Sequence, residues 1–123
     1  MNTVDSSGWL EYFAATALAP IFAPIIEKRS ELIVPSITIY EVHKKVLRDS
    51  GPAEASTAVG IMMRGRIILL TPSLAIDASR LSIRHKLPTA DSIIYATTLA
   101  NAAEVWTTDG HFKDLPFVHY FEK

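Results

Sequence analysis

Four acidic residues that lie far apart in the chain are its best candidates for chemistry: Asp5, Glu41, Asp91 and Asp109. Each lies at or beside a place where an apolar segment meets polar sequence, so folding can bring them into one cleft. Carboxylates held close together cannot all stay ionised unless cations offset their charge or some of them take up protons. The pattern therefore predicts a divalent-metal site that acts on phosphate.

Each of these acids also has an ordinary structural explanation. Asp5 and Asp109 suit turns, and Asp91 suits the first turn of a helix, where the helix dipole favours a negative charge. Glu41 can pair with Lys45, four residues further along a helix. The spacing alone therefore leaves open whether the four acids act together.

Composition limits the class of protein and the kind of metal. The 123 residues suit one domain spanning 1–123, and a chain that is half apolar and one fifth charged is typical of a soluble globule. There are no cysteines, which excludes thiolate zinc sites and a cysteine nucleophile and fits a reducing cytoplasm. Mg²⁺ prefers carboxylate oxygens, so four acids suit it better than zinc.

The charge and the apolar segments bear on the partners. A formal net charge of −1 is not typical of a nucleic-acid binder, although setting the four acids aside leaves +3 on the rest of the surface. The apolar run 13–26 contains Pro20 and Pro24 and is shorter than the ~20 residues of a membrane span. The N-terminal MNTVD carries an acid where an export signal needs positive charge. We therefore expect no membrane segment and a cytoplasmic location.

The elements that must position the acids alternate along the chain. We expect short strands over 2–5, 32–34, 67–70, 105–107 and 117–120. We expect helices over 8–18 (capped by the Ser6-Ser7 pair), from Pro20 to 27–29, from a Ser36 cap, over 53–63, over 72–85 and from a Thr89 cap. This alternation predicts an α/β fold with a parallel sheet covered by helices on both faces. Sites in such sheets form beyond the carboxyl ends of the strands, and all four acids can face that end.

Four segments carry a resemblance to a known family. They are VDSSGWLEYF, PSITIYEVHKKVLR, LPTADSIIYATTLA and VWTTDGHF, in this order and from Asp5 to Phe112. Together they resemble the PIN-domain family and, more narrowly, the VapC-type toxins of type II toxin–antitoxin pairs. The one mild departure is Gly8, where a bulkier apolar residue is common.

The resemblance implies a fold, an activity and a set of site residues. The fold is a three-layer α/β/α sandwich with a central, mainly parallel sheet, and the activity is that of an endoribonuclease dependent on Mg²⁺ or Mn²⁺. The four acids match the catalytic, metal-binding positions of the family, so that they would hold a metal-activated water. Ser6, Thr107 and His111 match supporting positions: the small residue after the first acid, a hydroxyl near the metals, and part of a TxDxHF ending.

The resemblance also implies partners. RNA phosphates are usually gripped by basic side chains, and the candidates are Lys44, Lys45, Arg48, Arg84 and Lys86. A homodimer is expected, together with a small antitoxin that sends a basic side chain into the acidic cleft. Apolar residues of the first two helices offer a surface for the antitoxin or form ordinary core: Phe13, Leu18, Ile21 and Phe22.

Two alternatives compete with the ribonuclease. A receiver-type signalling domain has a similar length and sheet, but it should show adjacent acids after the first strand, whereas Asp5 is followed by two serines. A non-catalytic PIN-like binding module usually lacks some of the acids, and all four are present here. Both are therefore weaker than the nuclease hypothesis.

Overall fold

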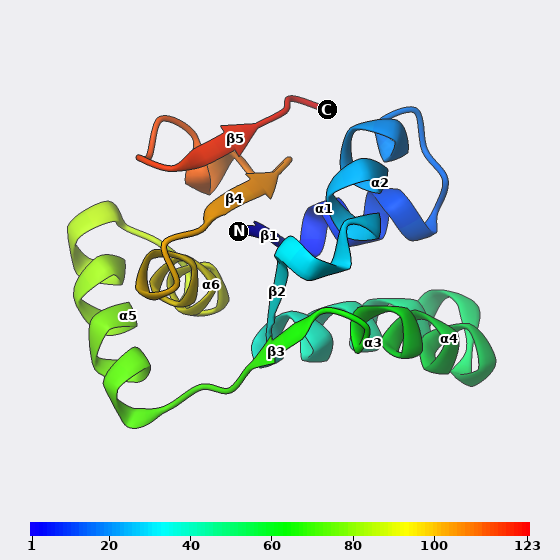
Figure 1. Cartoon of the computed structure of the whole chain (residues 1–123), viewed down its shortest axis with the longest axis horizontal. Helices are drawn as coiled ribbons and strands as arrows, with labels where there is room; N and C mark the ends of the chain where they lie inside the picture. Colours follow the sequence, from blue (N-terminus) through cyan, green and yellow to red (C-terminus); the bar gives the residue numbers. More distant parts are fainter.

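A computed structural model describes all residues, 1–123, as alternating strands and helices (Figure 1). The strands are β1 (Asn2–Val4), β2 (Leu32–Pro35), β3 (Arg66–Ile68), β4 (Glu104–Thr107) and β5 (Val118–Tyr120). The α-helices are α1 (Ser6–Phe13), α2 (Ala19–Glu27), α3 (Ser36–Ser50), α4 (Pro52–Met62), α5 (Pro72–His85) and α6 (Thr89–Ala100). Two short 3₁₀ helices are η1 (Arg29–Glu31) and η2 (Gly110–Phe112). No helix has the length and apolar character needed to cross a membrane.

The five strands form one parallel sheet in the order β3-β2-β1-β4-β5. Thr3 in the central strand is opposite Ile33 of β2 on one side and Val105 of β4 on the other. The chain fills the sheet outward from β1 through β2 to β3, and then returns to place β4 on the opposite side of β1. The strand order therefore reverses between β1 and β4, which is where open α/β sheets form their sites.

Helices cover both faces of the sheet because successive strand residues point in opposite directions. Val4 belongs to a core cluster with Trp9 of α1 and Phe22 of α2. Its neighbour Thr3 faces α6, and its Oγ1 accepts a hydrogen bond from Thr98 at 2.9 Å. Figure 1 shows α1 and α2 on one side of the strands and α6 on the other, with α5 packed on the side of α6 away from the strands. This confirms the expected three-layer α/β/α sandwich with a parallel sheet.

The first helix differs from the expected 8–18. It runs over Ser6–Phe13, and its N-cap is Asp5, whose carboxylate accepts the backbone N–H of Ser7 at 3.4 Å. Asp caps a helix as well as Ser does, so the acid one residue upstream takes the position that we expected for the serine pair. The helix stops early because Ala15 adopts the left-handed conformation at φ 52°.

Two further expectations about local structure were wrong. Ser36 and Thr89 are the first helical residues rather than caps, and the N-cap positions fall to Pro35 and Pro88, which make no side-chain cap bond. The strand expected over 67–70 lies at Arg66–Ile68. For Phe22 the open alternative is settled, because the side chain is fully buried and belongs to the core.

The packing around Gly8 accounts for the glycine in this first helix. A Cβ added at Gly8 would lie 2.7 Å from Val4 Cγ1 and 2.8 Å from two ring carbons of Phe22. Both neighbours are fully buried, so neither can move aside without disturbing the core. Gly8 therefore lets α1 approach β1 and α2 closely.

We predict that Gly8→Ala lowers the free energy of unfolding. Overpacking costs about 1–3 kcal/mol, which exceeds the helix-propensity gain of up to about 1 kcal/mol. Gly60→Ala is the matched control, because Gly60 is an exposed helical glycine of α4 whose Cβ would meet nothing within 4 Å. Urea denaturation should show a loss for Gly8→Ala and a small gain for Gly60→Ala, and equal midpoints would contradict the packing argument.

Candidate active site

Asp5 lies directly after the central strand, at the point where the strand order reverses. Its side chain is buried, with only 2% of the residue exposed. Oδ2 accepts hydrogen bonds from Ser7 Oγ at 2.8 Å and Thr107 Oγ1 at 2.9 Å. Oδ1 has no hydrogen-bond partner in the chain, so it remains free to bind a ligand.

Two hydroxyl groups join the start of α1 to the turn after β4. Ser7 Oγ lies 3.2 Å from Thr107 Oγ1 and accepts the backbone N–H of Thr108 at 3.0 Å. Thr107 Oγ1 accepts the backbone N–H of Asp109 at 2.8 Å. Sequence reasoning named Thr107 and Ser6 but missed Ser7. The available signal was its position two residues after a capping Asp, where a hydroxyl can return to the carboxylate.

Ser6 connects the first helix to Glu41. Ser6 Oγ donates a hydrogen bond to Glu41 Oε1 at 2.5 Å, although the two residues are 35 positions apart. Glu41 lies on the second turn of α3 and is half-buried. The two adjacent serines therefore orient different acids, Ser6 holding Glu41 and Ser7 holding Asp5.

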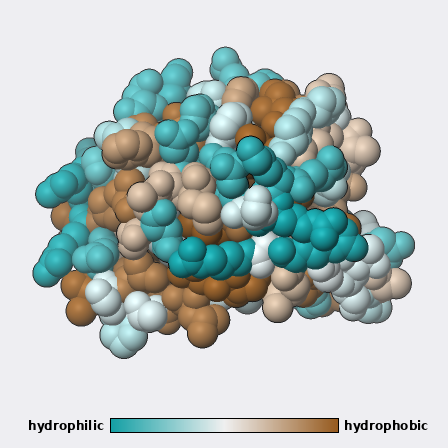
Figure 2. Space-filling view, viewed as in Figure 1, coloured by the Kyte–Doolittle hydropathy of each residue, from teal (hydrophilic) through white to brown (hydrophobic).

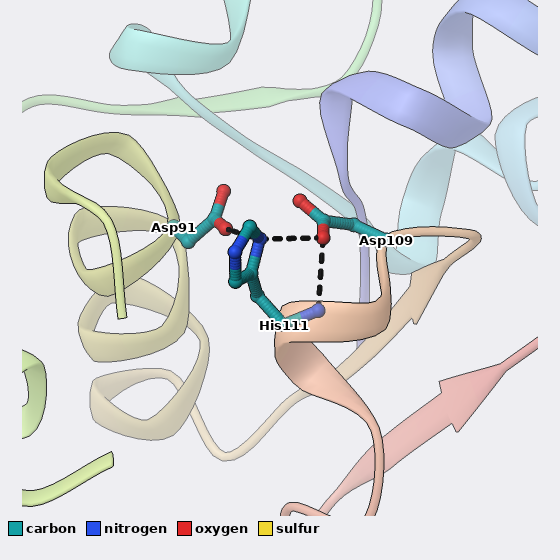
Figure 3. Close-up of side chains that lie close together, drawn as sticks. All are labelled: Asp91, Asp109 and His111. Atoms are coloured by element: carbon teal, nitrogen blue, oxygen red, sulfur yellow. Dashed lines mark hydrogen bonds and ion pairs between the residues drawn. The ribbon is translucent and has the colours of Figure 1, made fainter. Parts of the chain in front are cut away.

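Asp91 and Asp109 form the most compact part of the site, together with His111 (Figure 3). Asp91 lies in the first turn of α6 and is 7% exposed. Its Oδ2 is buried without a hydrogen-bond partner and lies 3.4 Å from His111 Nδ1. Asp109 caps η2, and its Oδ1 accepts the backbone N–H of His111 at 2.9 Å.

The three side chains offer donor atoms that all lie within 4.8 Å of one another. Asp5 and Glu41 lie outside this group, but their charges act on it. The structure therefore brings all four predicted acids into one electrostatic unit, which we call the acidic site, with Asp91, Asp109 and His111 as its tightest part.

The environment of the acidic site raises the pKa of two of its carboxyl groups. Burial and, after it, the charges of Asp5, Asp109 and Glu41 together raise the pKa of Asp91 to about 8. Burial also raises the pKa of Asp5, against the opposing hydrogen bonds from Ser7 and Thr107. No Lys or Arg forms an ion pair with any of the four acids.

These donors fit a hard divalent cation. Carboxylate oxygens are the ligands that Mg²⁺ and Mn²⁺ prefer, and the buried Oδ2 of Asp91 has neither a hydrogen-bond partner nor a Lys or Arg beside it. Four acids with no Lys or Arg among them repel one another when ionised. A bound cation would offset that repulsion.

The expected RNA-binding residues do not contact the acidic site. Lys45 and Arg48 both pair with Asp49, at 2.9 and 3.1 Å, and Lys44 lies 5.7 Å from the ring centre of Tyr40. The two remaining candidates, Arg84 and Lys86, are exposed at the end of α5.

A family model described as the PIN domain matches residues 3–118, so the chain belongs to the PIN-domain family. A receiver-type identity is therefore wrong. A search of curated proteins found no match.

Solved structures share the fold over nearly the whole chain. A toxin–antitoxin complex from Klebsiella pneumoniae matches with a TM-score of 0.84 and 20% identity, covering 100% of both chains. Mycobacterium tuberculosis VapC20, described as a sarcin–ricin loop cleaving toxin, matches with a TM-score of 0.81 and 20% identity over 96% of this chain and 97% of its own. DNA-bound VapBC from Salmonella typhimurium matches with a TM-score of 0.76 and 15% identity, covering 98% and 96%. At these identities the likeness concerns the fold.

We predict that the metal-free protein loses stability as the pH rises from about 4 to about 8. The pKa of Asp91 is about 8 in the folded chain, against 3.8 in the ordinary case, so across this range the folded state keeps a proton that the unfolded state releases. Thermal unfolding in EDTA should show this fall, and Asp91→Asn should reduce it. Asp77→Asn, at an exposed acid beside Arg80, is the control that should leave it unchanged. A thermal midpoint that stays constant or rises over this pH range would refute the raised pKa of Asp91.

Proposed function

We propose that the chain is a Mg²⁺- or Mn²⁺-dependent endoribonuclease and the toxin of a VapC-type toxin–antitoxin pair. One observation carries the proposal: four acids gather at the carboxyl edge of the sheet without a Lys or Arg to pair with them. Their repulsion contributes to the raised pKa of Asp91, which is about 8. Membership of the PIN-domain family supports a nuclease, and the likeness to VapC20 supports a toxin that cuts RNA.

The chain's own residues would hold and orient the acids for this reaction. When bound, a divalent cation lowers the pKa of a coordinated water and offsets charge on the phosphate. Asp91 offers Oδ2 and Asp5 offers Oδ1, since neither atom has another partner. Glu41 and Asp109 would complete the set. Ser6, Ser7 and Thr107 fix the carboxylates, so that little reorganisation is needed during the reaction.

We predict that Asp91→Asn lowers Mg²⁺-dependent RNA cleavage by about 100-fold or more. Loss of a group that only orients a metal ligand typically costs 10–100-fold, so loss of a ligand should cost at least as much. Gel analysis of cleaved RNA would measure the effect, with EDTA as a second way to stop it and Asp77→Asn as the matched control. Attack by water should leave a 5′-phosphate and a 3′-hydroxyl.

Three results would count against this activity. Cleavage that survives Asp91→Asn would refute the acidic site as the catalytic centre, and a 2′,3′-cyclic phosphate product would refute hydrolysis by water. RNA binding without cleavage, in the presence of Mg²⁺ and Mn²⁺, would favour the alternative of a non-catalytic PIN-like binding module.

A groove that includes Lys45, about one turn of α3 beyond Glu41, is a suitable docking surface for an antitoxin. It has a volume of about 420 Å³ and lies between α1, α3 and α4, lined by apolar side chains such as Phe13 and Val46 and by Lys45, Asp49 and Glu54. Lys45 on its rim is four residues from Glu41 along α3, a rise of about 6 Å. A segment in the groove would therefore bring a basic side chain within reach of the acids. The similar Klebsiella structure is itself a toxin–antitoxin complex.

We predict that Thr57→Arg weakens binding of the neighbouring gene's product by about tenfold or more, because Thr57 is an exposed residue that lines the groove. Ser56→Arg adds the same side chain to α4 at an exposed position outside the groove and should have little effect. Calorimetric titration would measure both. Equal binding by the two variants would exclude the groove, and unchanged RNA cleavage in a stable complex would exclude inhibition.

A second surface suits the expected homodimer. Exposed apolar residues follow β3 and continue into α5, and Figure 2 shows hydrophobic side chains along the lower edge of this face, where Figure 1 places that connection. They are Leu69, Leu70, Ile76 and Ile83, with Ile83 84% exposed. Light scattering of the chain alone should give twice the single-chain mass of 13.6 kDa. A single-chain mass would refute the dimer.

A further inference from the structure

His111 lies between two acids of the acidic site. Figure 3 shows the imidazole between Asp91 and Asp109, with Nδ1 2.8 Å from Asp109 Oδ1 and 3.4 Å from Asp91 Oδ2. The side chain belongs to η2 and is 57% exposed, so the ring reaches the site from the solvent side. The backbone N–H of His111 also donates to Asp109 Oδ1, which fixes the base of the side chain beside this carboxylate.

The chain contains a second histidine–carboxylate pair that shows what is special about His111. His119 Nε2 lies 2.6 Å from Glu104 Oε1, but its ring stacks on Trp106 with 4.1 Å between the ring centres, and it meets only this one acid. His111 makes no aromatic contact, and its ring nitrogen meets two acids that belong to different elements. One of those, Asp91 Oδ2, is buried and has no hydrogen-bond partner.

The positions of the donors are those that a shared ligand would require. The donor atoms of Asp91, Asp109 and His111 all lie within 4.8 Å of one another. In the absence of a cation, the ring nitrogen lies between the two carboxylates. A small rotation of an exposed and unstacked ring would let a cation take this position while the ring nitrogen stays in contact with it.

We propose that His111 is a metal ligand of the acidic site, adding one imidazole nitrogen to the carboxylate oxygens and so favouring Mn²⁺ over Mg²⁺. The inference rests on the proposed metal-dependent function and specifies which cation the site selects. Mg²⁺ binds nitrogen poorly and keeps its waters, whereas imidazole suits first-row transition metals. An all-carboxylate site would not discriminate in this way.

The decisive experiment detects the nitrogen directly. Mn²⁺ is added to the full-length protein, and pulsed electron paramagnetic resonance measures coupling between the metal electrons and ¹⁴N. The wild type should show an imidazole coupling, His111→Gln should lose it, and His119→Gln should keep it as the matched control. Calorimetry on the same proteins should show that His111→Gln weakens Mn²⁺ binding about tenfold and Mg²⁺ binding by less than about twofold.

The outcomes separate the ligand inference from the proposed function. Mn²⁺ that binds the wild type without ¹⁴N coupling, or a variant that weakens both cations equally, would overturn the role of His111 and leave the acidic site standing. Failure of Mn²⁺ and Mg²⁺ to bind the wild type would overturn both. Because His111 is mostly exposed, His111→Gln should keep the thermal midpoint of the wild type in EDTA to within a few degrees. If this folded variant still shows the ¹⁴N coupling of the wild type with Mn²⁺, the inference is also refuted.

Discussion

Repulsion between buried carboxylates is the constraint on which the site depends. The folded chain places Asp91 where burial and three neighbouring acids oppose its ionisation, and it provides no Lys or Arg to offset them. Such an arrangement persists only if the rest of the structure holds it, and here the parallel pairing of β1 with β4 does so by fixing the two strand ends that lead to Asp5 and Asp109. A bound cation would remove this strain, so that under the proposed function the repulsion that weakens the metal-free protein would supply affinity for metal.

A framework of hydroxyl groups organises the acids before any cation arrives. Ser6 and Ser7 are adjacent in sequence, yet one bonds Glu41 and the other bonds Asp5 and reaches the turn after β4. Thr107 closes the framework by donating to Asp5 and accepting from the backbone of Asp109. The first turn of α1 therefore connects Asp5, Glu41 and the turn after β4. The close approach that Gly8 permits keeps this helical turn against the sheet.

The sequence predicted the parts of the structure that local signals determine. Alternating short apolar runs and capped helices indicated the parallel sheet, and positions at strand ends or in a first helical turn indicated where Asp5 and Asp91 would lie. The bond of Ser7 to Asp5 had a local signal, but its contact with Thr107, 100 residues away, could not be found in this way. The contact of His111 with Asp91 and the tight packing of Gly8 against Phe22 likewise arise only from tertiary structure. The cap positions were misjudged because proline also takes the extended backbone of an N-cap, so Pro35 and Pro88 displaced the hydroxyl residues that follow them.

The most direct test of a metal site built from these acids is anomalous diffraction from crystals of the whole protein soaked in Mn²⁺. We expect a manganese peak in contact with Asp91 Oδ2, the buried oxygen that has no hydrogen-bond partner, and with at least one further acid of the site. Mn²⁺ bound only at other surface acids, or an empty acidic site at saturating Mn²⁺, would contradict the claim that the four carboxylates are gathered to hold a cation.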